Sequence, residues 1–468
     1  MKRANKISRT PIPVSTVHIV PPDERAAAGK ALRDKVPREW HGGWKAFNGR
    51  PSPIDILKRS DVGRMKALVP IRYGRMLQSP FAFYRGTAGL MASDLSRTPN
   101  AGLQVQACGD CHLMNFGGFA TPERNVIFDI NDFDETSPAP WEWDLKRLVA
   151  SMVLAARSIG LSDRQGRDCA ETTARSYREH MREFSRMDPL RVWYANISAE
   201  DIIGVVPQAV QKRIRKRLAK VTSGTGSELD FPKLAGNVGG QTRITDQPPL
   251  IFHPEDVHAP ETWAQIEKVL QAYRGTLADD RRMLLDRYRL VDVAIKVVGV
   301  GSVGRMCSIV LLMSEANDPL FLQCKEAGES VLEPYAGKSV YKHHGQRVVV
   351  GQRMMQPASD IFLGWVTGRT GQSLYVRQLR DAKIKPMVET FDAEVLDIYG
   401  MICGWVLARA HSKVSELSST ISGYLGSSDV FDKAMGRFAL AYADQAERDY
   451  AAMKAAVKKG KIKVYQES

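Results

Sequence analysis

The sequence predicts a mixed α+β protein in which helices from both ends of the chain surround one β-rich stretch. Apolar residues recur at helical spacing over residues 141–158, 391–413 and 430–459. Residues 291–325 instead contain three runs rich in β-branched residues and separated by turn residues: VDVAIKVVGVGSVG, RMCSIVLLM and PLFLQCK. Helical ends and a β-rich centre therefore define the fold class.

Composition is typical of a globular protein. Of the 468 residues, 44% are hydrophobic and 25% charged, which suits a chain with two or three sizeable cores. No run approaches the roughly 18 consecutive apolar residues of a membrane span. The basic N-terminus, MKRANKISRTPIPVSTVHIVPPDE, lacks the apolar core of a signal peptide. We therefore expect a cytoplasmic protein with no membrane partner and with its six cysteines reduced.

The formal net charge of +14 favours anionic partners, and nucleotides, nucleic acids and acidic metabolites all qualify. The basic cluster from Lys212 to Lys220 fits a solvated helix face, and a nucleic-acid patch is the alternative. No aromatic residue interleaves there, which argues against a stacking surface for single strands.

Four regions follow one another along the chain. Residues 1–50, rich in Pro, Lys and Arg, are expected to form an extended arm with one short helix near 24–36. Residues 51–250 are expected to form a helical lobe and 251–388 a β-rich lobe. Residues 389–468 are expected to add C-terminal helices that complete the helical lobe.

Inside these regions the residue patterns predict further elements. The first lobe should contain helices over 54–78, 141–158 and 163–220 and short strands over 103–108 and 124–129. The stretch 221–250, rich in Gly, Pro, Ser and Thr, should be an irregular connection. The second lobe should add helices over 260–288 and 338–355 and strands in DIFLGWV and SLYVRQL.

The chemistry-bearing residues concentrate between Cys108 and Glu135. This segment reads Gly-Asp110-x-His112-x-x-Asn115 and then continues through an apolar run into Asp129, Asp132 and Asp134. Phosphoryl transfer needs these residue types, because one carboxylate orients the nucleophile while an Asn and a second carboxylate hold magnesium. Magnesium prefers a few hard oxygen ligands and keeps several waters.

A second motif, GVGSVG, contributes Gly299, Gly301, Ser302 and Gly304. In a dinucleotide-binding fold the last Gly of such a motif opens a helix. Here the strand-like run RMCSIVLLM follows, which favours a glycine loop between two strands, the arrangement that covers ATP phosphates in kinases. A simple glycine-rich hairpin without a ligand is the third interpretation.

Lys325 ends the next predicted strand, FLQCK, where a kinase-like fold places the lysine that contacts the α- and β-phosphates. A lysine inside an apolar strand needs a partner. Glu329 or Glu333 could orient it, and Glu326 is a third possibility. Arg85, in SPFAFYRG, is either an anion contact or a surface arginine.

These motifs carry a family resemblance. GDCHLMNFG resembles the GDxHxxN loop of aminoglycoside and choline phosphotransferases, relatives of protein kinases, and DFDE followed by WDL resembles their IDF and DLA segments. Over roughly residues 55–450 the chain resembles an uncharacterised bacterial family, domain of unknown function 2252. The segments that carry this second resemblance are SPFAFYRG, CGDCHLMNFG, NDFDETSPAPWEWDLKRL, VGVGSVG, LQCKEA, GQRVVVGQRMMQ and LYVRQLRD.

The resemblance implies a protein-kinase-like fold of two lobes with a permuted chain order. Phosphotransferases of this type have the glycine loop and lysine first and the GDxHxxN loop later, whereas Asp110 precedes Gly299 here. The segment ARAHSK at 408–413 resembles the helix end that usually runs into the catalytic loop, yet it lies near the C-terminus. Because contacts rather than chain order define a site, such a permutation is physically permissible.

The resemblance also implies residue roles in an ATP- and magnesium-dependent phosphotransferase. Asp110 would deprotonate the acceptor hydroxyl, and His112 would orient the loop rather than act as a base. Asn115 and Asp132 would hold magnesium, because Asp132 stands at the family's spacing of about a dozen residues before Asp144. Asp134 would be a possible second ligand. Asp144 is expected to hydrogen-bond the catalytic loop, with Asp129 in a supporting position.

Other interpretations of the same residues stay open. Cys108, Cys111 and His112 satisfy the CxxCH pattern of haem attachment, and they could also serve a zinc site or a redox pair. The aspartates could serve a two-metal hydrolase. Nucleotidyl transfer, a non-catalytic nucleotide-binding regulator and a nucleic-acid-binding protein are the remaining alternatives. The acceptor, a small molecule or a protein, and the oligomeric state cannot be read from the sequence.

Overall fold

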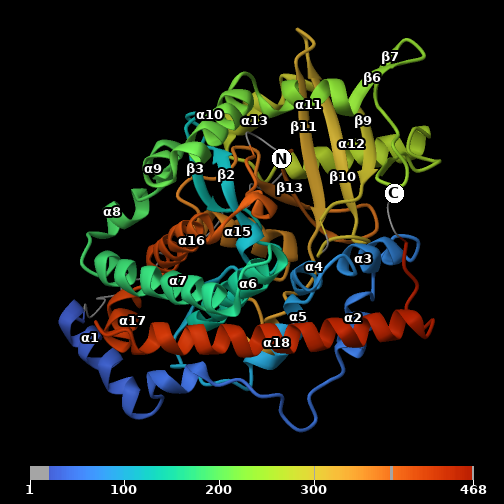
Figure 1. Cartoon of the computed structure of the whole chain (residues 1–468). Helices are drawn as coiled ribbons and strands as arrows, with labels where there is room; N and C mark the ends of the chain where they lie inside the picture. Colours follow the sequence, from blue (N-terminus) through green and yellow to red (C-terminus); the bar gives the residue numbers. More distant parts are fainter. Residues whose placement is uncertain (1–19, 300, 380–382, 466–468) are drawn as a thin grey trace, which may run out of the picture.

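The structure, a computed structural model, describes residues 20–299, 301–379 and 383–465. It is a mixed α+β fold, which confirms that level of the sequence prediction. The largest sheet has six strands. Figure 1 shows this sheet on one side and packed helices on the other, with the long helix α18 (Val430–Lys458) along the base of the helical part. In the described part of the chain, no helix combines the length and apolar character needed to cross a bilayer.

The sheet is antiparallel throughout, in the order β12-β13-β11-β10-β9-β8. Its strands are β8 (Ile251–Phe252), β9 (Tyr288–Lys296), β10 (Cys307–Ser314), β11 (Pro319–Glu326), β12 (Gly364–Thr367) and β13 (Ser373–Gln378). In this register Lys325 of β11 stands between Cys307 of β10 and Tyr375 of β13. The end of β11 therefore brings Lys325 next to the start of β10.

Side chains alternate between the two faces of this sheet, as strand geometry requires. Ile309, Leu311 and Phe321 pack on one face with Leu234 of α11 (Gly226–Leu234). Leu312, Leu320 and Leu322 pack on the other face with residues of α12 (Pro260–Arg274) and α13 (Asp279–Leu285). Both faces are covered, which explains why these strands are apolar almost without interruption.

The helical part has one main core to which both ends of the chain contribute. Its centre is α6 (Trp141–Ser158), of which all but the last two residues are buried. Helices α7 (Asp163–Phe184), α16 (Ala393–Lys413) and α18 surround it. A helix buried on all sides needs partners on all sides, and here some of these partners come from the last quarter of the chain.

The described N-terminal residues close this core against the C-terminal helices. Helix α1 (Pro22–Ala31) packs on α17 (Ser418–Leu425), and Arg33 donates hydrogen bonds to the carbonyls of Tyr424 and Gly423 at 2.8 and 2.6 Å. The short helix predicted near 24–36 is confirmed as α1 and the 3-10 turn that follows it, while residues 1–19 of the predicted arm lie outside the described residues.

Two small sheets carry the acidic segment. Strand β1 (Gln104–Ala107) pairs with β4 (Ser137–Pro140), and β2 (Phe116–Ala120) pairs with β3 (Val126–Ile130), which also pairs with β5 (Ile197–Ser198). Gly118 of β2 exchanges backbone hydrogen bonds with Ile384, at 2.9 and 2.8 Å. The segment that follows β13 is thereby attached to the acidic segment.

The remaining elements complete the chain. The helices are α2 (Pro53–Ser60), α3 (Val69–Met76), α4 (Pro80–Arg85), α5 (Ala88–Leu95), α8 (Pro189–Tyr194), α9 (Ala199–Val205), α10 (Gln208–Thr222), α14 (Glu333–Ala336) and α15 (His344–Met355). A two-stranded hairpin joins β6 (Ala235–Val238) to β7 (Gln241–Ile244), and four 3-10 turns are η1 (Leu32–Asp34), η2 (Arg38–Gly42), η3 (Leu113–Asn115) and η4 (Val388–Thr390).

Several predicted boundaries are wrong. The helix expected over 54–78 is two helices, α2 and α3, separated by a turn at Gly63, whose φ is +80°. The helix expected over 163–220 is four helices interrupted by β5. Strand β2 was not predicted, and the stretch 221–250 contains α11 and the β6–β7 hairpin instead of an irregular connection. Short elements held by tertiary contacts override local composition in these places.

Candidate functional site

A cavity of about 470 Å³ lies between the large sheet and the helical part. The acidic segment lines it, and so do the glycine motif and Lys325. The predicted site residues that line it are Asp110, His112, Asn115, Asp132, Asp134, Gly299, Gly301, Ser302, Lys325 and Glu329. Two predicted residues, Gly304 and Glu333, are not part of the lining.

Asp144, at the start of α6, fixes the backbone of the loop that carries Asp110. Its carboxylate accepts hydrogen bonds from the amides of Cys108 at 2.6 Å and Gly109 at 2.9 Å, which confirms its predicted contact. Gly109 has a φ of +83°, and an added Cβ would lie 2.3 Å from the Glu135 carbonyl oxygen. Only glycine fits this turn. Gly109 therefore determines the backbone position from which the Asp110 side chain extends.

Asp110 is held by a residue that the sequence did not point to. The Arg147 guanidinium, one helical turn after Asp144, donates from Nε to Asp110 Oδ1 at 2.7 Å. Although burial opposes it, the Asp110 carboxylate raises the pKa of Arg147 and keeps the guanidinium charged. Asn115 Nδ2 donates to the Asp110 carbonyl at 2.8 Å. The loop is therefore tied at both ends and presents Asp110 and Asn115 to one cavity.

His112 is buried beside Asp110, with Nε2 3.8 Å from Asp110 Oδ2. Burial lowers the pKa of His112 to about 3. The ring is therefore neutral at physiological pH and lacks a direct hydrogen bond to Asp110. This arrangement favours a positioning role over acid–base chemistry.

Acidification should lower the stability of the folded protein, because His112 is buried. His112 binds a proton in the unfolded chain near pH 6.5 but in the folded chain only near pH 3, so stability falls as pH drops through 6.5. Between pH 7.5 and 5.0 the His112 ring should cost about 2 kcal/mol of unfolding free energy. Urea unfolding of His112→Asn at both pH values should show a correspondingly smaller loss than wild type. His180→Asn, at a half-buried position of α7 outside the cavity lining, should lose as much as wild type, and equal losses in all three proteins would contradict this account.

Asp134 connects the acidic segment to the sheet. Its Oδ2 accepts hydrogen bonds from Lys325 Nζ at 2.7 Å and from Ser302 Oγ at 3.0 Å, while Tyr375 donates its hydroxyl hydrogen to Oδ1. Burial alone would raise the pKa of Asp134, but Lys325 and Tyr375 hold it well below its usual range. Residues separated by 168 and 191 positions thus meet at one carboxylate.

Asp132 is the carboxylate of this segment whose oxygens can still bind a ligand. Its Oδ1 accepts a long hydrogen bond of 3.3 Å from the Asp134 amide. Burial and the neighbouring Asp134 charge raise the pKa of Asp132. Two close carboxylates repel one another unless a cation lies between or beside them, so Asp132 is the acid that a bound cation would relieve.

Asn115 and Asp132 fit the predicted magnesium site. Asn115 uses its amide nitrogen on the loop, which leaves its side-chain oxygen for a ligand. An amide oxygen, a carboxylate and several waters are the ligands that Mg²⁺ prefers. Asp134 was predicted as a possible second ligand. Both of its oxygens instead accept hydrogen bonds, from Lys325, Ser302 and Tyr375.

The glycine motif lies in the connection between β9 and β10. Ser302 N donates to the Gly299 carbonyl at 2.9 Å, and Gly304 has a φ of +87°. Strand β10 follows from Cys307 and no helix opens there. The dinucleotide-fold interpretation is therefore wrong, and the motif is a hairpin between antiparallel strands. Arg64 secures it by donating to the carbonyls of Gly301, at 2.9 Å, and Val303.

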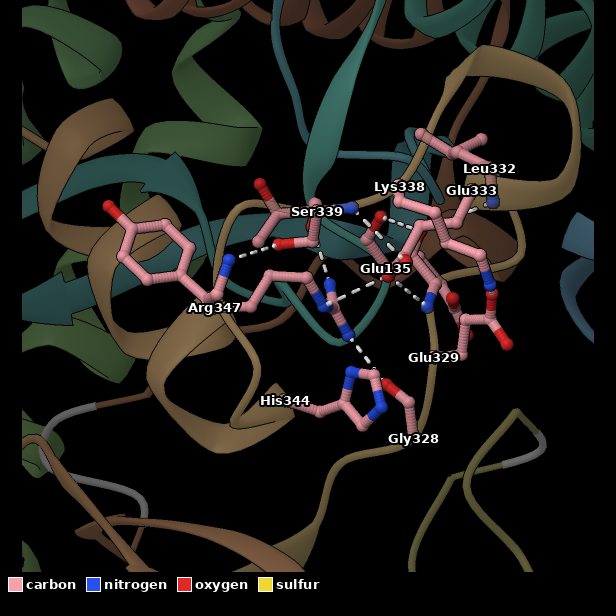
Figure 2. Close-up of polar contacts among 12 residues, drawn as sticks. Glu135, Gly328, Glu329, Leu332, Glu333, Lys338, Ser339, His344 and Arg347 are labelled. Carbon is pink, nitrogen blue, oxygen red and sulfur yellow. Dashed lines mark hydrogen bonds and ion pairs between the residues drawn. The ribbon is translucent and has the colours of Figure 1, made fainter.

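The expectation that a glutamate orients Lys325 is also wrong, because Asp134 has that position. Glu329 pairs with Lys338, and Glu326 accepts from the Met306 amide at 3.0 Å. Figure 2 shows the Glu329–Lys338 pair beside the Glu333 cluster.

Glu333 belongs to a buried network behind the cavity. It accepts from the amides of Ser330 and Ser339 at 3.1 and 3.2 Å and lies 3.8 Å from Arg347 Nε. Arg347 of α15 donates to the carbonyls of Asp134 and Gly328, both at 2.9 Å. Figure 2 shows this arginine between the acidic segment and the loop after β11. Its role in this structure is to fasten Asp134 to α15.

The cavity also carries basic groups that sequence reasoning missed or left open. Arg85 lines it from the end of α4 with most of its side chain buried, so the surface interpretation is wrong; its Nε has no hydrogen-bond partner among the described residues. Lys383 also lines the cavity, and burial and nearby Arg377 lower its pKa to about 7. These basic groups favour an anionic ligand.

The CxxCH-like cluster does not offer an open metal site. Cys108, Cys111 and Asp144 lie together and are buried, while His112 is not part of the group. Burial raises the pKa of Cys111 to about 11, so its thiol stays protonated at neutral pH. Asp144 is already occupied by loop amides.

The segment ARAHSK at the end of α16 meets the acidic segment directly. His411 Nε2 lies 3.3 Å from Asp144 Oδ2, and Arg409 forms a fully buried ion pair with Asp129. Asp129 is thus a structural partner of the C-terminal helix. A helix from residue 393 onward supports a loop at residue 110.

Fold and site together define a mixed α+β protein with a charged cavity between an antiparallel sheet and a helical core. A profile of the family described as "Uncharacterized protein conserved in bacteria (DUF2252)" matches residues 64–456. The chain belongs to this family. No curated protein and no solved structure matches it significantly.

Proposed function

We propose that this protein is an ATP- and magnesium-dependent phosphotransferase with a kinase-like site. The observation that carries the proposal is the single cavity lined by Asp110, Asn115, Asp132, Lys325 and the glycine hairpin. Phosphoryl transfer depends on such positioning and on charges that surround the phosphates.

The order of the strands supports a kinase-like arrangement. Kinases place the glycine loop between their first two strands and the phosphate-binding lysine on the third. Here the glycine hairpin joins β9 to β10, and Lys325 stands on β11, the next strand in both sequence and sheet. The contact between the end of α16 and Asp144 supports a permuted chain order, because a helix end near residue 411 lies beside the loop at residue 110.

In the proposed mechanism the chain supplies positioning and charge. Lys325 exchanges its ion pair with Asp134 for the α- and β-phosphates, and the backbone around Gly299 and Gly301 covers them. Magnesium, held by Asn115 and Asp132, would neutralise phosphate charge. Asp110 accepts the proton of the acceptor hydroxyl, while Arg147 holds its other face in place.

Mg-ATP should raise the melting temperature by several degrees at saturation, because a ligand that binds only the folded state stabilises it. Incubation with ATP labelled at the α- or γ-phosphate, with product separation, then assigns the chemistry. Release of ADP and label transfer from the γ position support phosphoryl transfer. Pyrophosphate release would support nucleotidyl transfer instead. A thermal shift without any turnover would indicate a nucleotide-binding regulator, and the absence of a shift with every nucleotide would contradict the proposal.

A further inference from the structure

A second group of metal-binding side chains lies on the large sheet, outside the cavity. His253 follows β8, His258 precedes α12, and Asp292 is the middle of β9. One ligand atom from each lies within 4.8 Å of the others. None of the three lines the cavity described above. We propose that His253, His258 and Asp292 form a zinc site that fastens the edge of the sheet.

The distances fit one cation. His253 Nε2 lies 3.1 Å from Asp292 Oδ2, and His258 Nε2 lies 3.0 Å from Asp292 Oδ1. Tetrahedral zinc with bonds of about 2.0–2.2 Å holds its ligand atoms roughly 3.3–3.5 Å apart. A shift of a few tenths of an ångström in the two partly exposed rings would therefore accommodate the ion.

The hydrogen bonds around His253 prepare it as a ligand. Its Nδ1 lies 2.8 Å from Asp246 Oδ1, so this nitrogen carries the hydrogen and donates it. Nε2 of the same ring points at the Asp292 carboxylate, 3.1 Å from Oδ2, so a cation between these two atoms would be bound by both. A carboxylate on the outer nitrogen is the usual support for a metal-bound histidine.

Asp292 is an unusual residue for its position. It is fully buried in an apolar sheet, and its carboxyl oxygens accept hydrogen bonds from the Ile244 and Val293 amides at 2.7 and 2.9 Å. Each oxygen retains a lone pair directed at a histidine. Buried carboxylates are stable where they are paired or coordinate a metal.

The chemistry selects zinc over magnesium. Two imidazoles and one carboxylate suit zinc, whereas magnesium prefers oxygen ligands alone. His258 is partly exposed, which leaves room for water as the fourth ligand. Such an ion would tie the β6–β7 hairpin, β8 and the segment before α12 to the strand that leads into the glycine hairpin.

Zinc content of the untagged full-length protein tests this proposal. After incubation with Zn²⁺ and gel filtration, the wild type should retain one zinc per chain, and EDTA should lower its melting temperature. The double variant His253→Gln, His258→Gln should retain little zinc and should not respond to EDTA. Asp246→Asn should weaken zinc binding by about 10- to 100-fold without removing a ligand.

Two control variants locate the ion. Cys108→Ser with Cys111→Ser should keep the zinc, and so should Asp132→Asn, which changes the proposed magnesium site. Failure of the wild type to bind zinc, equal zinc in the double histidine variant, or loss of zinc in the cysteine variant would each overturn the proposal. The Mg-ATP thermal shift is measured separately, so failure of the zinc site and failure of the proposed function give different results.

Discussion

Asp110→Asn should lower turnover by about 10²- to 10⁴-fold, the usual contribution of a general base, while Mg-ATP still raises the melting temperature. The amide keeps the shape of the side chain and an oxygen for Arg147, but it cannot accept the proton of the acceptor. That loss corresponds to about 3–5 kcal/mol of transition-state stabilisation. Product formation from labelled ATP and thermal melts of the same preparations provide both measurements.

The variant also removes the negative partner of a buried arginine, so its ligand-free melting temperature should fall. Nucleotide binding is therefore compared as the shift relative to each protein's own ligand-free value. Asp318→Asn, in the exposed turn between β10 and β11, is the matched control and should behave as wild type. Equal loss of the thermal shift and of turnover in Asp110→Asn would assign Asp110 a structural role.

Lys325→Met should abolish most of the Mg-ATP thermal shift. Charge-assisted hydrogen bonds contribute about 1.5–3 kcal/mol each, so losing the ammonium should weaken nucleotide binding by about 10- to 150-fold. Methionine keeps most of the volume at this buried position of β11, where only 4% of Lys325 is exposed. Isothermal titration with Mg-ATP measures the affinity directly.

Lys338→Met is the control for this variant, because Lys338 is an exposed lysine that pairs with Glu329. Its affinity for Mg-ATP should equal that of the wild type. An unchanged affinity in Lys325→Met would place the nucleotide elsewhere and would contradict the assignment of the cavity.

The sequence predicted best where one local pattern determines the outcome. Helix α6 follows directly from its apolar spacing, and the contact of Asp144 with the loop follows from a motif with fixed spacing. The split of 54–78 into α2 and α3 did not follow, since Gly63 reads as a tolerable helix residue until its φ is known. Strand β2 was not predicted because Gly117, Gly118 and Ala120, three of its five residues, have low β-propensity.

The sequence predicted individual residues of the site, but it did not predict which of them form ion pairs with one another. Residue types identified Asp134 and Lys325 separately, yet their ion pair depends on how two distant segments pack. The glutamates near Lys325 in sequence were misleading, because residues that follow a strand turn away from its end. Arg147 carried one usable signal: it lies three residues after Asp144 on the same helix, so the two side chains lie on one face and can reach the same polar neighbour.

The dependence of α6 on α16 and α18 has a consequence for biosynthesis. Roughly 235 residues of chain separate the end of α6 from the start of α16. At about 5–20 residues per second, the ribosome needs about 12–50 s to supply those missing partners. During that interval the nascent chain displays an apolar helix that its own N-terminal half cannot cover, so its yield in the cell should depend on chaperones that bind such surfaces.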